Sequence, residues 1–195
     1  MKPAQVNAAL ANVTVMTDVP RGYDTYTLFV STSYDYSRLD GVDKITQTLS
    51  DRFRAFGDSI GPRNLAVFVS DVQTRRLEVS AGQAVLQRVD RSYGLTDAFE
   101  KGPYIIVLQQ HPADQPLPGQ TVAVISLQGH SPDQIRSILD ELSLEIQRAH
   151  RNETPAPTRP AFRGFWESFR DGWNAGSTVA GPNRTLATII ISRAT

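Results

Sequence analysis

The stretch at 103–108, PYIIVL, is the strongest strand-like run of the chain, and it begins with a proline. Proline has no backbone N–H and a fixed φ, so a strand tolerates it at its first residue and excludes it from central positions. A connection rich in proline, HPADQPLPGQ, separates this run from a second one, TVAVISL. The pattern therefore predicts an antiparallel hairpin whose first strand starts at Pro103.

Two more strand-like runs precede the hairpin. They are YTLFVSTS at 26–33 and LAVFVSD at 65–71, both short and rich in apolar, β-branched or aromatic residues. Between them, apolar residues recur every three or four positions over 42–56, which predicts one buried helix face. Asp40 is the expected N-cap of this helix, and Gly57 is its expected stop.

Two further helices are expected later in the chain. The first covers about 80–93, and the stretch TRRLEV before it is compatible with a loop, a helix or an extra strand. The second covers 131–150. Ser131 is its predicted N-cap and Pro132 its first residue. Gln134 completes a capping box, in which the side chain of each of the two residues, Ser131 and Gln134, accepts a hydrogen bond from the backbone N–H of the other.

Charge and hydropathy exclude several classes of protein. The chain of 195 residues has 20 Lys and Arg and 20 Asp and Glu, so its formal net charge is zero. Nucleic-acid binding needs a surplus of Lys and Arg on one surface, so we expect no nucleic-acid partner. No run approaches the length of a transmembrane helix, and the N-terminus has no apolar stretch typical of a signal peptide. We therefore expect a cytoplasmic globular protein.

Cysteine is absent, which excludes disulfides, thiolate catalysis and Cys-ligated metal. The histidines at 111, 130 and 150 lack the spacing of a metal site and are interpreted as structural, so we expect no metal and no cofactor. The chain also has no nucleophile elbow, P-loop or dinucleotide-binding fingerprint. An enzyme with non-thiol chemistry remains an alternative, without a recognisable set of catalytic groups.

From Tyr26 to about His150 the expected order is strand, helix, strand, helix, strand, strand, helix. Helices join the first three strands, which predicts parallel strands with right-handed crossovers. This order resembles the thioredoxin fold, in which a cis-proline stands immediately before the third core strand. GPYIIV occupies that place here. The resemblance implies an α/β fold with a thioredoxin-like sheet, flanking helices and a cis bond between Gly102 and Pro103.

The chain departs from the redox members of that family at their reactive site. Those enzymes carry one or two cysteines between the first strand and the first helix, where this chain has STSYDYSRLDG. Disulfide exchange needs sulfur on the protein, so we expect a redox-inactive domain. The resemblance leaves a groove that binds extended peptides, or a small molecule in an alternative reading, with five candidate residues: Tyr34, Asp35, Tyr36, Gly102 and Pro103. A solvated loop is the simpler interpretation of the tyrosine-rich segment.

The C-terminal part contains an aromatic stripe. AFRGFWESFRDGW predicts an amphipathic helix with aromatic residues at offsets of zero, three, four, seven and eleven, namely Phe162, Phe165, Trp166, Phe169 and Trp173. This helix is expected to pack on its own domain, lie on a membrane surface or fill a groove on a protein partner. Its balanced polar face disfavours the membrane, and anchors at these offsets favour the partner groove.

These patterns divide the chain into four parts: an N-terminal extension at 1–25, a thioredoxin-like domain at 26–150, a proline-rich linker at 151–160 and a docking segment at 161–195. TLATIIIS, near the end, is expected to add a strand to a nearby sheet edge during docking. The leading hypothesis is a structural or adaptor subunit that assembles, with a protein partner or with itself, through this last segment.

Overall fold

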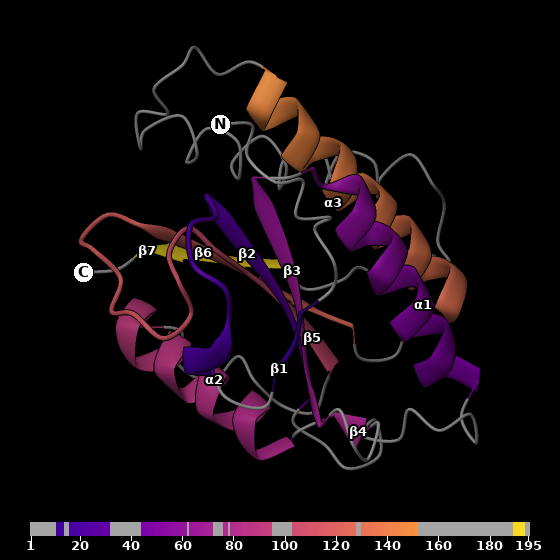
Figure 1. The fold of residues 1–195 in the computed structure, drawn as a ribbon, viewed down its shortest axis with the longest axis horizontal. Helices are drawn as coiled ribbons and strands as arrows, with labels where there is room; N and C mark the ends of the chain where they lie inside the picture. The colour runs from indigo at the N-terminus through magenta and orange to yellow at the C-terminus, as the bar shows by residue number, and fades with distance from the viewer. Residues whose placement is uncertain are drawn as a thin grey trace, which may run out of the picture.

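A computed structural model describes the chain at 11–13, 16–31, 44–61, 63–71, 76–77, 79–94, 103–127, 130–151 and 189–193. Its strands form a mixed sheet in the order β1-β3-β2-β5-β6-β7, and β4 pairs with β3 (Figure 1). Their bounds are β1 Ala11–Val13, β2 Thr25–Ser31, β3 Asn64–Asp71, β4 Arg76–Leu77, β5 Pro103–Leu108, β6 Thr121–Ser126 and β7 Ile189–Arg193. The helices are α1 Lys44–Ser59, α2 Val79–Tyr93 and α3 Pro132–Arg151, preceded by a 3-10 turn at Met16–Asp18.

The strand directions correct one expectation. β2 and β3 are parallel, as predicted, and β5 and β6 form the predicted antiparallel hairpin. The third core strand, β5, is instead antiparallel to β2, with Tyr26 opposite Leu108 and Ser31 opposite Pro103. After a helical crossover, the next strand is parallel to the first only if the chain enters the sheet at the end where the first strand began. Residues 95–102 separate α2 from β5. At up to about 3.5 Å per residue, this segment is long enough for the chain to enter at the opposite end of the strands.

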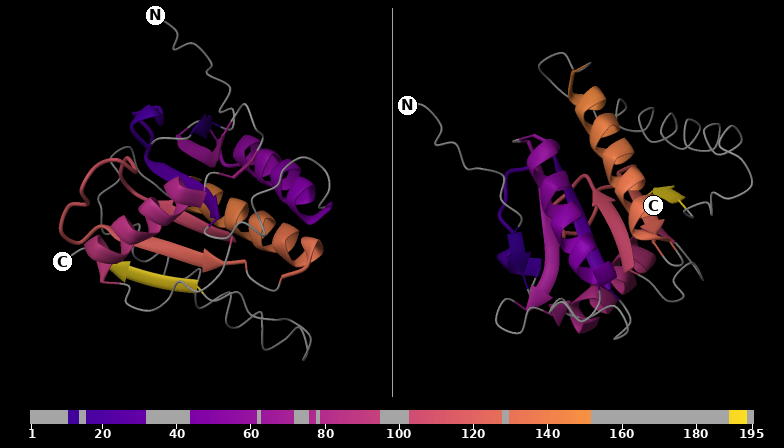
Figure 2. Two further views of the ribbon diagram at one scale, coloured as in Figure 1. Left: turned by 90° about the horizontal axis from the view of Figure 1, so that it is seen from below. Right: turned by 90° about the vertical axis from the view of Figure 1, so that its right-hand side faces the viewer.

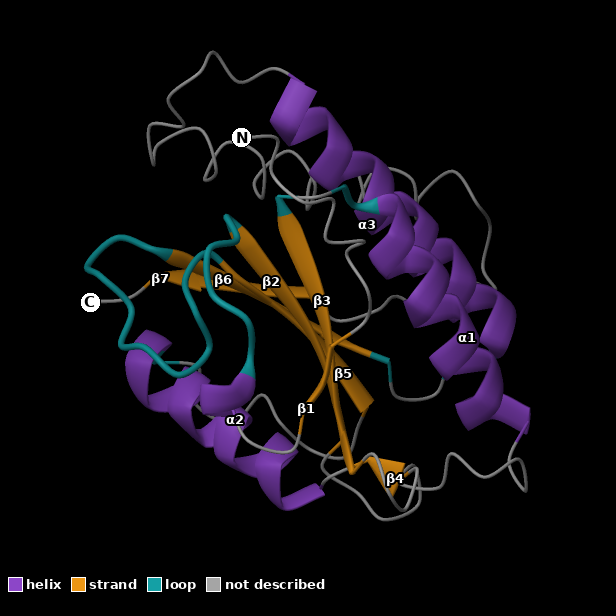
Figure 3. Ribbon diagram, viewed as in Figure 1, coloured by secondary structure: helices purple, strands orange, loops and turns teal. Residues whose placement is uncertain are grey.

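Helices cover both faces of the sheet (Figure 3). α1 and α3 pack together on one face and α2 lies on the other, so strand residues alternate between two cores. Phe29 of β2 points to the first core, where its ring stacks on Phe68 at 5.0 Å and contacts Phe53 of α1 at 5.4 Å between ring centroids. Its neighbours Leu28 and Val30 point to α2. This two-sided burial explains why the strand runs are continuously apolar.

The end of α1 also differs from the expectation. Gly57 lies inside the helix, because α1 continues to Ser59. A Cβ at position 57 would lie 3.0 Å from the Cβ of Ala66 on β3, so this glycine permits close packing of helix and strand. The chain leaves the helix at Gly61, whose φ of 84° suits glycine. Asp40, the expected N-cap, lies outside the described residues.

The start of α3 confirms the capping box. The N–H of Ser131 donates to Oε1 of Gln134 at 2.7 Å, and the N–H of Gln134 donates to Oγ of Ser131 at 3.3 Å. Pro132 is the first helical residue, as predicted. The reciprocal hydrogen bonds satisfy two backbone donors that a helix start leaves without intrahelical partners.

The last described strand forms within TLATIIIS and just beyond it, and it adds to a sheet edge, as expected. β7 pairs antiparallel with β6 of the same chain, with Val124 opposite Ile190, and Figure 2 shows it beside β6 at the edge of the sheet. The free edge of β6 is the nearest template for an apolar strand, so the chain covers its own edge. The N-terminal β1 similarly covers the edge of β3, within the part expected to be an extension.

None of the helices in the described ranges has the length and hydropathy needed to cross a membrane.

Candidate functional site

The structure describes one of the sequence-predicted groove residues. Pro103 is buried at the first position of β5, opposite Ser31, and its carbonyl oxygen accepts a hydrogen bond from the N–H of Leu127 at 2.9 Å. The other groove candidates, Tyr34, Asp35, Tyr36 and Gly102, lie outside the described residues, so the bond between Gly102 and Pro103 is not described. The aromatic residues of the C-terminal stripe also lie outside them.

The corner around Pro103 is closely packed. A Cβ placed on Gly82 of α2 would lie 2.2 Å from the carbonyl oxygen of Ser31 and 3.3 Å from its nitrogen. Only a residue without a side chain allows this approach of helix to strand. The glycine thus sets the distance between α2 and the end of β2 beside Pro103.

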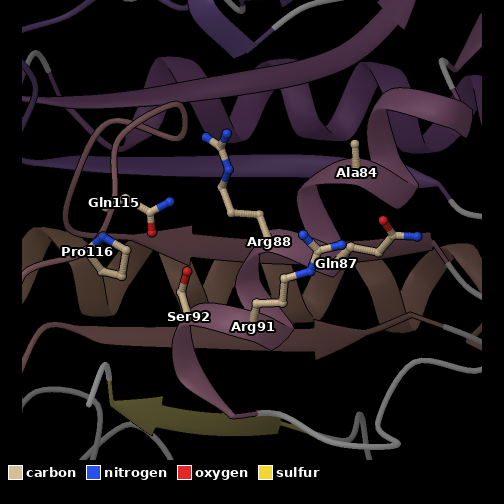
Figure 4. Close-up of a pocket in the computed structure, with 7 residues that line it drawn as sticks. All are labelled: Ala84, Gln87, Arg88, Arg91, Ser92, Gln115 and Pro116. Atoms are coloured by element: carbon tan, nitrogen blue, oxygen red, sulfur yellow. The ribbon is translucent and has the colours of Figure 1, made fainter.

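A groove of about 510 Å³ lies between α2 and the connection from β5 to β6 (Figure 4). Its described lining is polar apart from an alanine and a proline, and it contains no carboxylate: Ala84, Gln87, Arg88, Arg91, Ser92, Gln115 and Pro116. The two arginines and Ser92 come from the solvent side of α2. Gln115 and Pro116 come from the connection, which forms the other wall.

A buried histidine holds that wall in place. His111 is 5% exposed, and its Nε2 donates to the carbonyl oxygen of Val19 at 2.9 Å. Its Nδ1 accepts a hydrogen bond from the N–H of Ala113 at 3.2 Å, and its ring meets the edge of Tyr26. The structural interpretation of this histidine is confirmed. Its contacts fix the start of the connection that carries Gln115.

An ion pair fixes the same connection from outside. Arg21 donates two hydrogen bonds to the carboxylate of Asp114, at 2.8 and 2.9 Å. This hydrogen bonding holds the pKa of Asp114 below its ordinary value of 3.8, and the charges of Arg21 and Arg88 contribute less. The bidentate pair occupies both oxygens of the Asp114 carboxylate, which precedes the groove residue Gln115 in the chain.

The two groove arginines differ in their partners. Arg88 donates through one terminal nitrogen to the carbonyl oxygen of Pro112 at 3.0 Å, so its guanidinium is held beside the connection. Arg91 has no ion pair or hydrogen bond within the described ranges, whereas Arg21, Arg63 and Arg136 each pair with a carboxylate. The groove therefore presents positive charge that the described part of the protein does not neutralise.

Sequence reasoning missed this groove. A signal was present, because Arg88 and Arg91 are three positions apart and share a helix side, while Val85 and Val89 mark the buried side. The opposing wall was not readable, because it depends on where the connection after β5 folds back in space.

A second, smaller hollow of about 320 Å³ lies between α1 and α3. Phe56, Leu139 and the half-exposed Leu144 contribute apolar surface, and Arg136 is paired there with Asp140. Arg52 of α1 also lines it, and in contrast to the described lining of the α2 groove it contains a carboxylate, that of Asp140.

Two properties of the described residues bear on the chemistry of the groove, namely metal-binding clusters and shifted pKa values. No group of three His, Cys, Asp or Glu side chains among them is placed to hold a metal ion. Near the groove, burial raises the pKa of Tyr93, and a hydrogen bond from Gln110 at 2.7 Å opposes that rise. A phenol held protonated in this way is not activated as a base.

Comparisons with known proteins return no match: none with a protein-family model, none with a curated protein and none with a solved structure.

Proposed function

We propose that this chain is a redox-inactive thioredoxin-like domain that serves as a structural or adaptor subunit. The observation that carries the proposal is the order of β2, α1, β3, α2, β5, β6 and α3, which follows the order of the thioredoxin fold. The central position of β2 between β3 and β5 supports it. The placement of Pro103 at the first residue of β5 supports it further.

The missing cysteines make this domain inactive in disulfide exchange. The chain has none, and attack on a disulfide requires a thiolate. In an insulin-reduction assay with dithiothreitol, the purified protein should leave the background rate unchanged. Acceleration that co-purifies with the chain would contradict this part of the proposal.

Assembly is assigned to the aromatic stripe, Phe162 to Trp173. Five such side chains on one helix face would bury on the order of 150–250 Å² each, which is too much apolar surface to leave in water. The stripe belongs to a connection whose two ends, at α3 and at β7, are joined to the same fold.

Light-scattering mass measurement under native conditions tests this assembly. Replacing Phe165, Trp166, Phe169 and Trp173 with serine should abolish assembly, whether with a second copy or with a co-purifying partner, and leave a folded monomer. The matched control replaces Arg163 and Arg170, on the polar side of the same segment, with alanine and should retain the assembly. Assembly that survives the loss of all four aromatic side chains would overturn the proposal.

A further inference from the structure

We propose that the groove between α2 and the β5–β6 connection binds a small molecule with two oxyanion groups, phosphates or carboxylates. This binding site goes beyond the proposed function, which uses the C-terminal segment. A volume of about 510 Å³ suits a small ligand. The described lining is polar and has no carboxylate, which suits an anionic ligand in particular.

The first contribution is a pair of arginines three positions apart on α2. Arg88 and Arg91 both extend from α2 in Figure 4, and residues three positions apart on a helix have Cβ atoms about 5–6 Å apart. Each guanidinium offers a planar fork of N–H donors that matches a carboxylate or a phosphate. Two such forks on one helix side match a ligand that carries two anionic groups.

The second contribution is that the site is already built. Arg88 donates one hydrogen bond to the carbonyl oxygen of Pro112. This bond orients the guanidinium and leaves its other N–H donors for a ligand. The opposite wall is held by the buried His111 and by the ion pair of Arg21 with Asp114. Ligand binding should therefore cost little conformational entropy in either wall of the groove.

The third contribution is hydrogen-bonding side chains around the arginines. Ser92 and Gln115 line the groove and donate to oxyanions, and Gln87 extends the same polar surface along the helix. Asp114, which precedes Gln115 in the connection, is already paired with Arg21. The formal net charge of zero gives no overall positive field to attract a nucleic acid, so a confined small polyanion fits this site better.

The test is a titration of the full chain with pyrophosphate and, separately, with citrate, followed by amide NMR and calorimetry. We expect saturable amide shifts at residues 84–92 and at Gln115, with a Kd below about 1 mM for at least one probe. The two arms distinguish phosphate from carboxylate ligands. Added salt should weaken the binding, because partly exposed charges are screened.

Variants decide whether the arginines are responsible. Arg88→Ala with Arg91→Ala should raise the Kd at least tenfold, and Arg91→Lys, which keeps the charge but loses the fork, should have a smaller effect. The matched control, Arg52→Ala with Arg54→Ala, makes the same change in charge on α1 and should stay within about twofold of the wild type.

Two results would overturn the proposal. One is the absence of saturable shifts in the groove at probe concentrations on the order of 10 mM. The other is equal weakening in the α1 control, which would indicate general charge attraction. Because Arg91 has no described partner, the single variant Arg91→Ala should keep the wild-type melting temperature, so weaker binding there cannot be attributed to unfolding.

Discussion

Gly82 lies against the backbone carbonyl of Ser31, so closely that a Cβ at position 82 would be 2.2 Å from the carbonyl oxygen. The contact joins α2 to the end of β2, at the point where Ser31 pairs with Pro103 of β5. Gly82, which has no side chain, therefore sets how closely α2 packs against the centre of the sheet.

Gly82→Ala should destabilise the protein by about 2 kcal/mol, measured by urea unfolding. Overpacking a close contact costs roughly 1–3 kcal/mol, and the better helix propensity of alanine returns at most about 1 kcal/mol. Gly57→Ala is the matched control, because its Cβ would meet only the Cβ of Ala66 at 3.0 Å. It should cost less than Gly82→Ala. The reverse ranking would show that α2 does not pack against Ser31 in this way.

Asn64→Ala should cost about 1–3 kcal/mol of unfolding free energy. Asn64 is 1% exposed, and its Nδ2 donates to the carbonyl oxygen of Ile60 at 2.6 Å, just beyond α1. Its Oδ1 accepts from the hydroxyl of Thr25, so Thr25→Val should cost less, and the two changes should not be additive. Fully additive effects in a double-mutant cycle would contradict the shared hydrogen-bond network.

Arg21→Gln should raise the pKa of Asp114 towards its ordinary value of 3.8, as followed by carboxyl NMR titration. A folded-state pKa below the unfolded value means that the carboxylate contributes stability above the unfolded pKa, and that this stability is lost as the pH falls through the folded pKa. The variant should therefore unfold with a weaker acid dependence below about pH 4. Arg88→Gln, the control, acts only through charge and should move the pKa less.

Removal of the C-terminal residues should separate β7 from the aromatic segment. Truncation after Arg151 exposes the edge of β6 and should lower the unfolding free energy. Replacing 161–176 with a Gly-Ser linker of equal length keeps β7 and should leave that free energy near the wild-type value. Equal destabilisation by both changes would mean that the aromatic segment belongs to the domain's own core.

The sequence predicted local elements well, because burial on both faces and helix caps leave local patterns. The runs that became β2, β3, β5 and β6, and the capping box of Ser131, are examples. The direction of β5 was missed, because parallel and antiparallel entry use the same apolar run. Gly57 was assigned as a stop, because a sequence does not distinguish a glycine needed for close packing from one needed for positive φ.

The groove was beyond sequence reasoning for a similar reason. Arg88 and Arg91 are on a readable helix side, but Gln115 approaches them only because His111 and Asp114 hold the connection in place. These contacts join residues about ninety positions apart in the chain.

The measurement that tests the proposed assembly most directly is tryptophan quenching by acrylamide, combined with light-scattering mass. The chain has two tryptophans, Trp166 and Trp173, and both lie in the aromatic stripe, so their fluorescence reports on that segment alone. The account predicts that the tryptophans are protected in the assembly and become accessible, with red-shifted emission, in the isolated monomer. A monomer of 21.5 kDa whose tryptophans stay protected at every concentration would contradict it, because the stripe would then be packed within its own chain.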